Sequence, residues 1–249
     1  MHDTDQITKK FSIIIPALNE EKLLKRLLDQ FPVELRKAYD FEVIVSDGGS
    51  KDLTIKIARE NADRIILHSE KKPQNISQGR NEGAKNSLGD VLIFLNADTY
   101  VSDVDYFFSE VYRQFRNKDV TAVACRIEVF PDEVRLSDKI FHGFYNNYVA
   151  LLNKLLMGMG RGECQIVKRE KFFDVSGYNE KLAAGEDFDL YKRLRKRGRI
   201  KYRRDILIYE SPRRYRKFGY ANVFWNWTRN SLSVLFFNRS ASKSWEAVR

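Results

Sequence analysis

Five short polar clusters in the sequence carry side chains that could bind a charged ligand or move a proton. They are Pro16-Ala17-Leu18-Asn19-Glu20, Ser46-Asp47-Gly48-Gly49-Ser50, Gln78-Gly79-Arg80-Asn81-Glu82-Gly83, Asn96-Ala97-Asp98 and Gly185-Glu186-Asp187-Phe188-Asp189-Leu190. The Asp47 carboxylate could accept hydrogen bonds from a base or a ribose, and Asp98 offers a hard oxygen ligand to Mg²⁺ or Mn²⁺. The forked donors of Arg80 suit the diphosphate that such an ion bridges. Together these side chains fit a metal-bound nucleoside diphosphate.

Two common nucleotide-binding motifs are absent. Residues 16–20 lack the glycines of G-x-G-x-x-G, and no G-x-x-x-x-G-K-[ST] occurs in the chain. The usual NAD and ATP sites are therefore not expected, and neither is a nucleotidyltransferase of sugar phosphates, which needs a Gly-rich N-terminal phosphate loop. Each cluster taken alone also has a structural explanation, because Asn19, Asn96 and Asp98 could cap helices and residues 47–49 could form a turn.

The fifth cluster places Glu186 and Asp187 at the start of a helix expected over residues 186–197. The helix dipole favours an ionised carboxylate at this end. An ionised Asp187 beside an acceptor hydroxyl could serve as a general base. Acidic residues also favour first turns for stability alone, and helix chemistry by itself does not separate these two interpretations.

Alternating strands and helices must position these clusters. Short apolar runs predict strands at residues 11–16, 41–46, 64–68 and 91–95. Helical spacing predicts helices at residues 20–30, 51–61 and 76–87. This alternation implies an α/β fold with a mostly parallel sheet and helices on both faces. Ligands of such sheets bind beyond the carboxyl ends of the strands, where several of the clusters converge.

The pattern changes after Pro131. An aromatic and leucine-rich stretch at residues 138–159 ends in a glycine-rich segment that we expect to be flexible, and a strand is expected at residues 164–167. We expect a catalytic domain over residues 1–210 and a basic, aromatic helical extension over residues 211–249. Within the catalytic domain, residues 1–130 would bind the nucleotide and residues 131–210 would face the acceptor.

The net charge of +10 is concentrated near the C-terminal end. Residues 1–190 carry 27 basic and 31 acidic side chains, whereas residues 191–217 carry 13 basic and 2 acidic ones. This distribution excludes a uniformly cationic coat for nucleic acid. Arg213 and Arg214 in the basic segment could reach into the site and bind a diphosphate or an anionic acceptor.

Residues 218–237 predict a strongly amphipathic helix. Its apolar face is formed by Ala221, Phe224, Trp225, Trp227, Leu232, Leu235 and Phe236. Two interpretations compete: the helix packs on the core or on a partner in a homodimer, or it lies in the plane of a membrane surface. Near an anionic leaflet each Lys or Arg contributes on the order of 1 kcal/mol, which places the membrane interpretation slightly ahead.

Two cysteines, Cys125 and Cys164, are too few for a disulfide framework or a four-Cys zinc site. Neither an apolar signal-peptide core nor a run of about 18 apolar residues occurs in the sequence. We therefore expect a cytoplasmic protein that associates peripherally with the cytoplasmic face of the cell membrane.

The segments SIIIPALNEE, VIVSDGGSKDLT, GRNEGAKNSLGDVLIFLNADT and GYNEKLAAGEDFDLYKRLRKRG, in this order, resemble glycosyltransferase family 2. The resemblance covers residues 10–200 and implies the Rossmann-like GT-A fold. It further implies an inverting transferase that moves a hexose, such as mannose, from a UDP- or GDP-linked donor with the help of Mn²⁺ or Mg²⁺. The acceptor would be a glycan or a lipid-linked molecule, and no nucleic acid partner is expected.

Carried over by position, the resemblance assigns roles to individual residues. The donor-binding set is Pro16, Ala17, Asn19, Glu20, Asp47, Gly48, Arg80, Asn96, Ala97, Asp98, Arg213 and Arg214. Asp98 would bind the metal, and Asp187, supported by Glu186, would be the catalytic base. The chain departs from the family's D-x-D motif at Asn96, whose amide carries no charge and so weakens the expected metal affinity.

Two further functions stay open. A polyprenyl-phosphate (dolichyl-phosphate-type) sugar synthase would transfer to a phosphate that is already anionic, so a required Asp187 favours a hydroxyl acceptor instead. A non-catalytic module that binds membranes or nucleic acid on a transferase fold would explain the basic end. Such a module has no need for Asp98 and Asp187, which argues against it.

Overall fold

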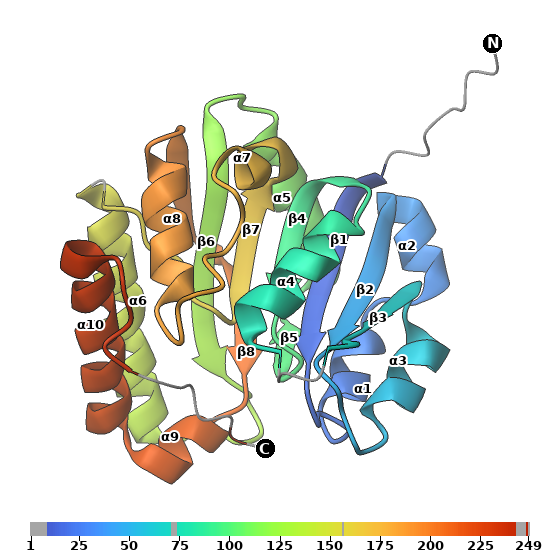
Figure 1. Cartoon of the computed structure of the whole chain (residues 1–249), viewed down its shortest axis with the longest axis horizontal. Coiled ribbons are helices and arrows are strands. Elements are labelled where there is room, and N and C mark those ends of the chain that lie inside the picture. The colour runs from blue at the N-terminus through green and yellow to red at the C-terminus, as the bar shows by residue number, and fades with distance from the viewer. Residues whose placement is uncertain (1–8, 71–73, 156, 243–247, 249) are drawn as a thin grey trace.

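The computed structural model describes residues 9–70, 74–155, 157–242 and 248. Its centre is one sheet of eight strands among the described residues, with helices on both faces (Figure 1). The strands are β1 (Lys9–Ala17), β2 (Phe41–Asp47), β3 (Arg64–Leu67), β4 (Gly89–Leu95), β5 (Thr99–Val101), β6 (Val120–Val129), β7 (Cys164–Lys168) and β8 (Arg199–Glu210). They lie side by side in the order β3-β2-β1-β4-β7-β6-β8-β5.

The sheet is mixed. The strands β3, β2, β1 and β4 run parallel, as the alternating pattern predicts, with Ile13 in register with both Val43 and Ile93. Strand β7 is antiparallel to β4 and β6, and β5 is antiparallel to β8, whereas β6 and β8 are parallel. The parallel half therefore brings the ends of β1, β2 and β4 to one edge.

Alternate residues of the buried strands point to opposite faces of the sheet. Ile13 and Ile15 pack with α1 (Leu24–Leu28), α2 (Val33–Tyr39), α3 (Thr54–Asn61) and α5 (Val104–Phe115) on one face. Ile14 and Phe94 pack with α4 (Ile76–Lys85), α7 (Arg169–Asp174) and α8 (Glu186–Arg195) on the other. The predicted α/β layering is confirmed.

Three further helices form a separate aromatic cluster at one end of the sheet. They are α6 (Leu136–Lys154), α9 (Arg213–Phe218) and α10 (Tyr220–Phe237). Helices α6 and α10 lie side by side (Figure 1), and Trp227 of α10 contacts Phe141 and Tyr145 of α6 with ring centroids 6.4 and 5.3 Å apart. The predicted C-terminal helix thus packs on α6, the longest helix among the described residues.

Several elements were not foreseen from the sequence. The helix expected at residues 20–30 is the shorter α1, which is followed by α2 after Pro32. Strands β6 and β8 were also missed. The first half of β8 is charged and only partly buried, so it lacks the apolar signature of the central strands.

Candidate active site

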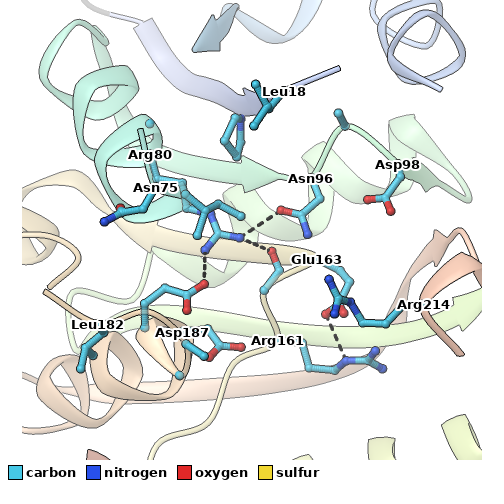
Figure 2. A pocket seen from close by; sticks show the side chains of 18 of the residues that line it. Leu18, Asn75, Arg80, Asn96, Asp98, Arg161, Glu163, Leu182, Asp187 and Arg214 are labelled. Carbon is cyan, nitrogen blue, oxygen red and sulfur yellow. Dashed lines mark hydrogen bonds and ion pairs between the residues drawn. The ribbon is translucent and has the colours of Figure 1, made fainter. Parts of the chain in front are cut away.

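A cavity of about 600 Å³ lies beyond the carboxyl ends of β1, β2 and β4. Residues of α6, α8, α9 and α10 form its opposite wall, and Figure 2 shows a selection of the lining side chains. The predicted site residues that line it are Pro16, Ala17, Glu20, Gly48, Arg80, Asn96, Ala97, Asp98, Glu186, Asp187, Arg213 and Arg214. The fold thus brings together side chains that are far apart in the sequence.

Asn19 and Asp47 are not among the lining residues; they shape the loops beside the cavity. The buried Asp47 carboxylate accepts hydrogen bonds from the backbone N–H groups of Gly49 and Ser50, at 2.9 and 2.8 Å, and from the Ser50 hydroxyl at 2.5 Å. Asn19 has a φ of 54°, donates its N–H to the Ser50 hydroxyl and accepts from the N–H of Lys51. These bonds join the loop after β1 to the loop after β2. Direct contact of Asn19 or Asp47 with a nucleoside stays a prediction.

Arg80 connects three of the predicted clusters. Helix α4 approaches β1 so closely at Gly83 that an added Cβ would lie 2.3 Å from Cγ2 of Ile14. This packing leaves the Arg80 side chain 1% exposed beneath the cavity. Its guanidinium donates to Oε1 of Glu186 and Oδ1 of Asn96, both at 3.0 Å, and to the carbonyl of Gly162 at 2.7 Å (Figure 2). Arg80 therefore holds Glu186 and Asn96 in place, and its contact with a diphosphate stays a prediction.

Asp187 lies in the first turn of α8, after Gly185 in the left-handed conformation. One carboxylate oxygen accepts the backbone N–H of Phe188 at 2.8 Å. Burial and the neighbouring Glu186 carboxylate raise the pKa of Asp187 to about 7. Burial and the like charge of Glu186 thus oppose the helix dipole, which favours the ionised form of Asp187, and the role of this carboxylate as a base stays a prediction. A carboxylate with this pKa is matched to proton transfer near neutral pH.

Arg213, at the start of α9, bridges two of the strand-end loops. Its guanidinium lies 2.9 Å from Oδ2 of Asp98 and 2.8 Å from Oε1 of Glu20. The sequence suggested that Arg213 reaches into the site. In the structure its guanidinium contacts the carboxylate of Asp98, the predicted metal ligand.

The donor set fits a divalent cation that the substrate helps to bind. Within the described part of the chain, no three His, Cys, Asp or Glu side chains are grouped as metal ligands. Mg²⁺ and similar ions commonly bind one or two protein carboxylates and take further ligands from phosphates and water. Asp98 would hold such an ion together with a diphosphate once Arg213 leaves its carboxylate. The Asn96 amide oxygen already accepts from Arg80.

A second ionic network forms another wall of the cavity and was not predicted. Arg161, 3% exposed, donates to Oε1 of Glu210 at 2.6 Å and to Oε2 of Glu163 at 3.2 Å, and it lies over the Tyr145 ring at 4.9 Å. The Tyr215 hydroxyl also donates to Glu210, at 2.8 Å. The sequence signal was weak, because Arg161 and Glu163 fall in the glycine-rich segment and Glu210 is the last residue of β8.

Burial and the close charges of this network shift the pKa values of its members. Burial, reinforced by the Glu163 carboxylate, raises the pKa of Glu210 well above its usual value. Although burial acts in the opposite direction, the Arg161 guanidinium lowers the pKa of Glu163. Burial and then Arg161 lower the pKa of the nearby His142 to about 3, so this imidazole is neutral at physiological pH.

Part of the basic segment before α10 is paired with carboxylates of the protein. Arg216 contacts the buried Asp138 at 2.5 Å, and Arg203 contacts Glu110 at 2.5 Å. Arg193 and Arg213 also form ion pairs, so some of the local positive charge neutralises internal carboxylates. No helix in the described ranges combines the length and apolar character needed to cross a bilayer.

The sequence model of Glycosyl transferase family 2 matches residues 12–175. The chain belongs to this family. Its α/β architecture is the predicted GT-A fold. Among solved structures it is similar to the mannosyltransferase PcManGT from Pyrobaculum calidifontis in complex with GDP-Man and Mn²⁺. That similarity has a TM-score of 0.68 at 20% identity and covers 90% of this chain and 62% of the other.

Three further proteins are similar to this chain, over different shares of their own length. Glucosyl-3-phosphoglycerate synthase from Mycobacterium tuberculosis, solved with Mn²⁺, UDP and glucosyl-3-phosphoglycerate, gives a TM-score of 0.60 at 17% identity over 91% of this chain and 78% of that one. The O-antigen biosynthesis protein RfbC of Myxococcus xanthus is 25% identical over 77% of this chain, which spans 16% of that protein. A PGL/p-HBAD biosynthesis glycosyltransferase of Mycobacterium bovis is 36% identical over 38% of each chain.

Proposed function

We propose that this family 2 glycosyltransferase moves a hexose from a UDP- or GDP-linked donor to an acceptor hydroxyl with inversion at the anomeric carbon. The observation that carries the proposal is the position of Asp187, a carboxylate with a pKa of about 7 on the same cavity as Asp98 and Arg213. Related folds bind either class of donor, since PcManGT was solved with GDP-Man and Staphylococcus aureus TarS with UDP-GlcNAc.

The reaction follows from the roles of these side chains. Asp187 accepts the hydroxyl proton as the acceptor oxygen attacks the anomeric carbon. The bond from this carbon to the donor's phosphate oxygen breaks, and its electron pair leaves with the nucleoside diphosphate. Arg213 and Arg214 offset the charge that develops on this leaving group. A Mn²⁺ or Mg²⁺ ion held by Asp98 would supply further electrophilic stabilisation of the diphosphate when bound.

Arg80 and Glu186 are positioning residues in this scheme. Glu186 adds to the burial that raises the pKa of Asp187, while Arg80 fixes the Glu186 carboxylate at 3.0 Å. Arg80 also donates a hydrogen bond to Asn96. The same buried guanidinium therefore positions residues next to the proposed base and residues of the proposed donor site.

A phosphate acceptor on a lipid, as in a polyprenyl-phosphate sugar synthase, is the second candidate. It is favoured by the cavity lining, which includes the cationic Arg161 and Arg214 as well as Tyr145, Met159 and Trp227, and Arg161 lies over the rings of Tyr145 and Trp227. The two candidate functions can be distinguished by the type of acceptor that the Asp187→Asn variant still uses. Asp187→Asn would abolish transfer to a hydroxyl and spare transfer to a phosphate, which has no proton to lose.

The proposal places the enzyme on the cytoplasmic face of the cell membrane as a peripheral protein. A glycan or lipid-linked acceptor is in keeping with relatives that are named for O-antigen and PGL/p-HBAD biosynthesis. Residues 1–130 would serve the donor and residues 131–210 the acceptor, with the extension from residue 211 supplying Arg213 to the donor side. Homodimer formation remains an alternative use of the extension.

Calorimetric titration with a panel of UDP- and GDP-sugars, with and without Mn²⁺, tests the proposal. We expect one donor class to bind, with higher affinity in the presence of Mn²⁺. Asp98→Asn should remove the effect of Mn²⁺, whereas Asp90→Asn, an exposed aspartate near the other end of β4, should not change it. Absence of binding to every nucleotide sugar would reject the proposal.

A further inference from the structure

Helices α6 and α10 expose an unusual number of large apolar side chains. On α6 and its C-terminal cap these are Leu136, Ile140, Phe144, Leu151 and Leu155. On α10 they are Trp225, Leu232, Phe236 and Phe237. Each is between 49% and 74% exposed. Apart from Phe237, successive members within each helix are four or seven residues apart, so they form one stripe along the helix.

The two stripes are continuous. Phe224 of α10 lies between them, with its ring 5.4 Å from Phe144 and 6.1 Å from Tyr148. Because α6 and α10 lie side by side at the end of the sheet (Figure 1), their outer faces form one surface. We refer to the exposed apolar residues of these two helices as the α6–α10 surface. Soluble monomers seldom expose a contiguous apolar patch of this kind without a partner.

Neither helix exposes a carboxylate. Asp138 is the one acidic residue within the bounds of α6 and α10, and it is fully buried against Arg216. Exposed cations flank the apolar stripes at Lys139, Lys154 and Arg229. Arg204 adds another, since it donates to the side chain of Asn147 on the outer face of α6 at 2.7 Å.

We propose that the α6–α10 surface docks onto an anionic lipid bilayer, with both helices parallel to the membrane plane. Apolar side chains bordered by Lys and Arg, without exposed acids, match the requirements of an interfacial helix. A second copy of this chain fits less well. In a two-fold symmetric contact the same surface meets itself, so the flanking cations of the two copies would be brought together.

The surface differs from the one that the sequence predicted. Three residues of the aromatic face of α10, Phe224, Trp227 and Leu235, pack against the cluster that includes α6. Arg213 and Arg216, in the basic segment, are engaged with internal carboxylates. The bilayer would instead contact the outer stripe of α6 and the neighbouring edge of α10.

Docking through the α6–α10 surface adds to the proposed function. What it implies about the acceptor rests on that function. Tyr145, Trp227 and Asn230 of the same two helices line the catalytic cavity. One helix diameter, about 10 Å with side chains, therefore separates the cavity from the docking surface. An acceptor anchored in the bilayer would reach the cavity along the edge of this helix pair.

Co-sedimentation of the full chain with vesicles tests the docking without any donor. We expect the protein to bind vesicles of phosphatidylglycerol and phosphatidylcholine at low salt, and to bind pure phosphatidylcholine vesicles more weakly. The double variant Ile140→Ser/Phe144→Ser should lose more than about tenfold in partitioning, because burying a single large apolar side chain is already worth about that factor. Lys154→Gln/Arg229→Gln should weaken binding to the anionic vesicles alone.

A matched control replaces apolar residues of similar exposure elsewhere. Leu53→Ser/Tyr112→Ser changes side chains that are 58% and 52% exposed and lie outside the α6–α10 surface, and it should bind as the wild type does. Donor titration confirms that each variant is folded and reports on the proposed function separately. Wild-type protein that stays in solution with anionic vesicles would overturn the docking. So would a dimer, detected by sedimentation velocity, that Ile140→Ser/Phe144→Ser dissociates.

Discussion

Replacing Glu186 by Gln should move the pH dependence of catalysis to lower pH. The amide oxygen of Gln can still accept the hydrogen bond that Arg80 donates to Oε1 of Glu186 at 3.0 Å, so the geometry is retained while a negative charge is lost. After burial, this charge is the largest cause that raises the pKa of Asp187 to about 7. Without it, the positive charge of Arg80 acts on Asp187 with less opposition, and the pKa of Asp187 must fall.

The size of the effect follows from the titration of Asp187. If the ionised carboxylate is required and its pKa is about 7, kcat/KM at pH 6 is roughly a tenth of its plateau value and at pH 5 roughly a hundredth. Lowering the pKa in Glu186→Gln raises the fraction of active enzyme on this acid limb. At pH 6 we compare kcat/KM, expressed as a fraction of each enzyme's own plateau value. This fraction can be at most about tenfold higher in Glu186→Gln than in the wild type.

The assay is the release of nucleoside diphosphate at subsaturating donor and acceptor between pH 5 and 8.5. Glu180→Gln is the matched control, because it makes the same change in charge at another residue of the cavity lining. The acid limb should move down in Glu186→Gln and stay in place in Glu180→Gln. An acid limb that is unchanged or displaced upward in Glu186→Gln would refute the coupling of Glu186 to Asp187.

Three other substitutions have definite expected outcomes. Asp187→Asn should lower transfer to a hydroxyl by about 10²- to 10⁴-fold with an unchanged donor Kd, and normal turnover would remove the base assignment. Because native Asp187 binds its proton more tightly than the unfolded chain does, stability declines as pH rises from about 4 to 7, so Asp187→Asn should raise Tm at pH 8 and not at pH 4. Arg213→Ala should tighten Mn²⁺ binding to the donor-free protein, measured by electron paramagnetic resonance; equal affinity would show that the arginine and the metal do not compete. Gly83→Ala should cost about 1–3 kcal/mol in urea unfolding because its Cβ would collide with β1, whereas Gly143→Ala, with open space around it, should cost nothing.

The parallel half of the sheet could be predicted because β1, β2 and β4 are largely buried and appear in the sequence as apolar runs. In the other half the strand at residues 164–167 was predicted as β7 but its antiparallel direction was not, and β8 was missed because it begins with charged residues. Local patterns do not carry information of this kind. The boundaries of helices were also less certain than their presence, as the short α1 shows.

The cavity likewise has residues whose position could be predicted from the sequence and residues whose position could not. Residues at the ends of strands, such as Asp98, could be assigned because the sheet architecture fixes where they lie. Asn19 and Asp47 were placed in the correct loops, but their side chains bond to the adjoining backbone. The network of Arg161 with Glu163 and Glu210 depends on contacts between distant segments, which one sequence does not reveal.

The most direct test of the central claim is a transfer assay with purified protein, Mn²⁺ and the donor identified by titration. A panel of hydroxyl and lipid-phosphate acceptors is added, and both nucleoside diphosphate release and the anomeric configuration of the product are measured. We predict acceptor-dependent release with inverted configuration, lost for hydroxyl acceptors in Asp187→Asn and retained in Asp90→Asn. A retained configuration, or hydroxyl glycosylation that proceeds normally in Asp187→Asn, would contradict the account.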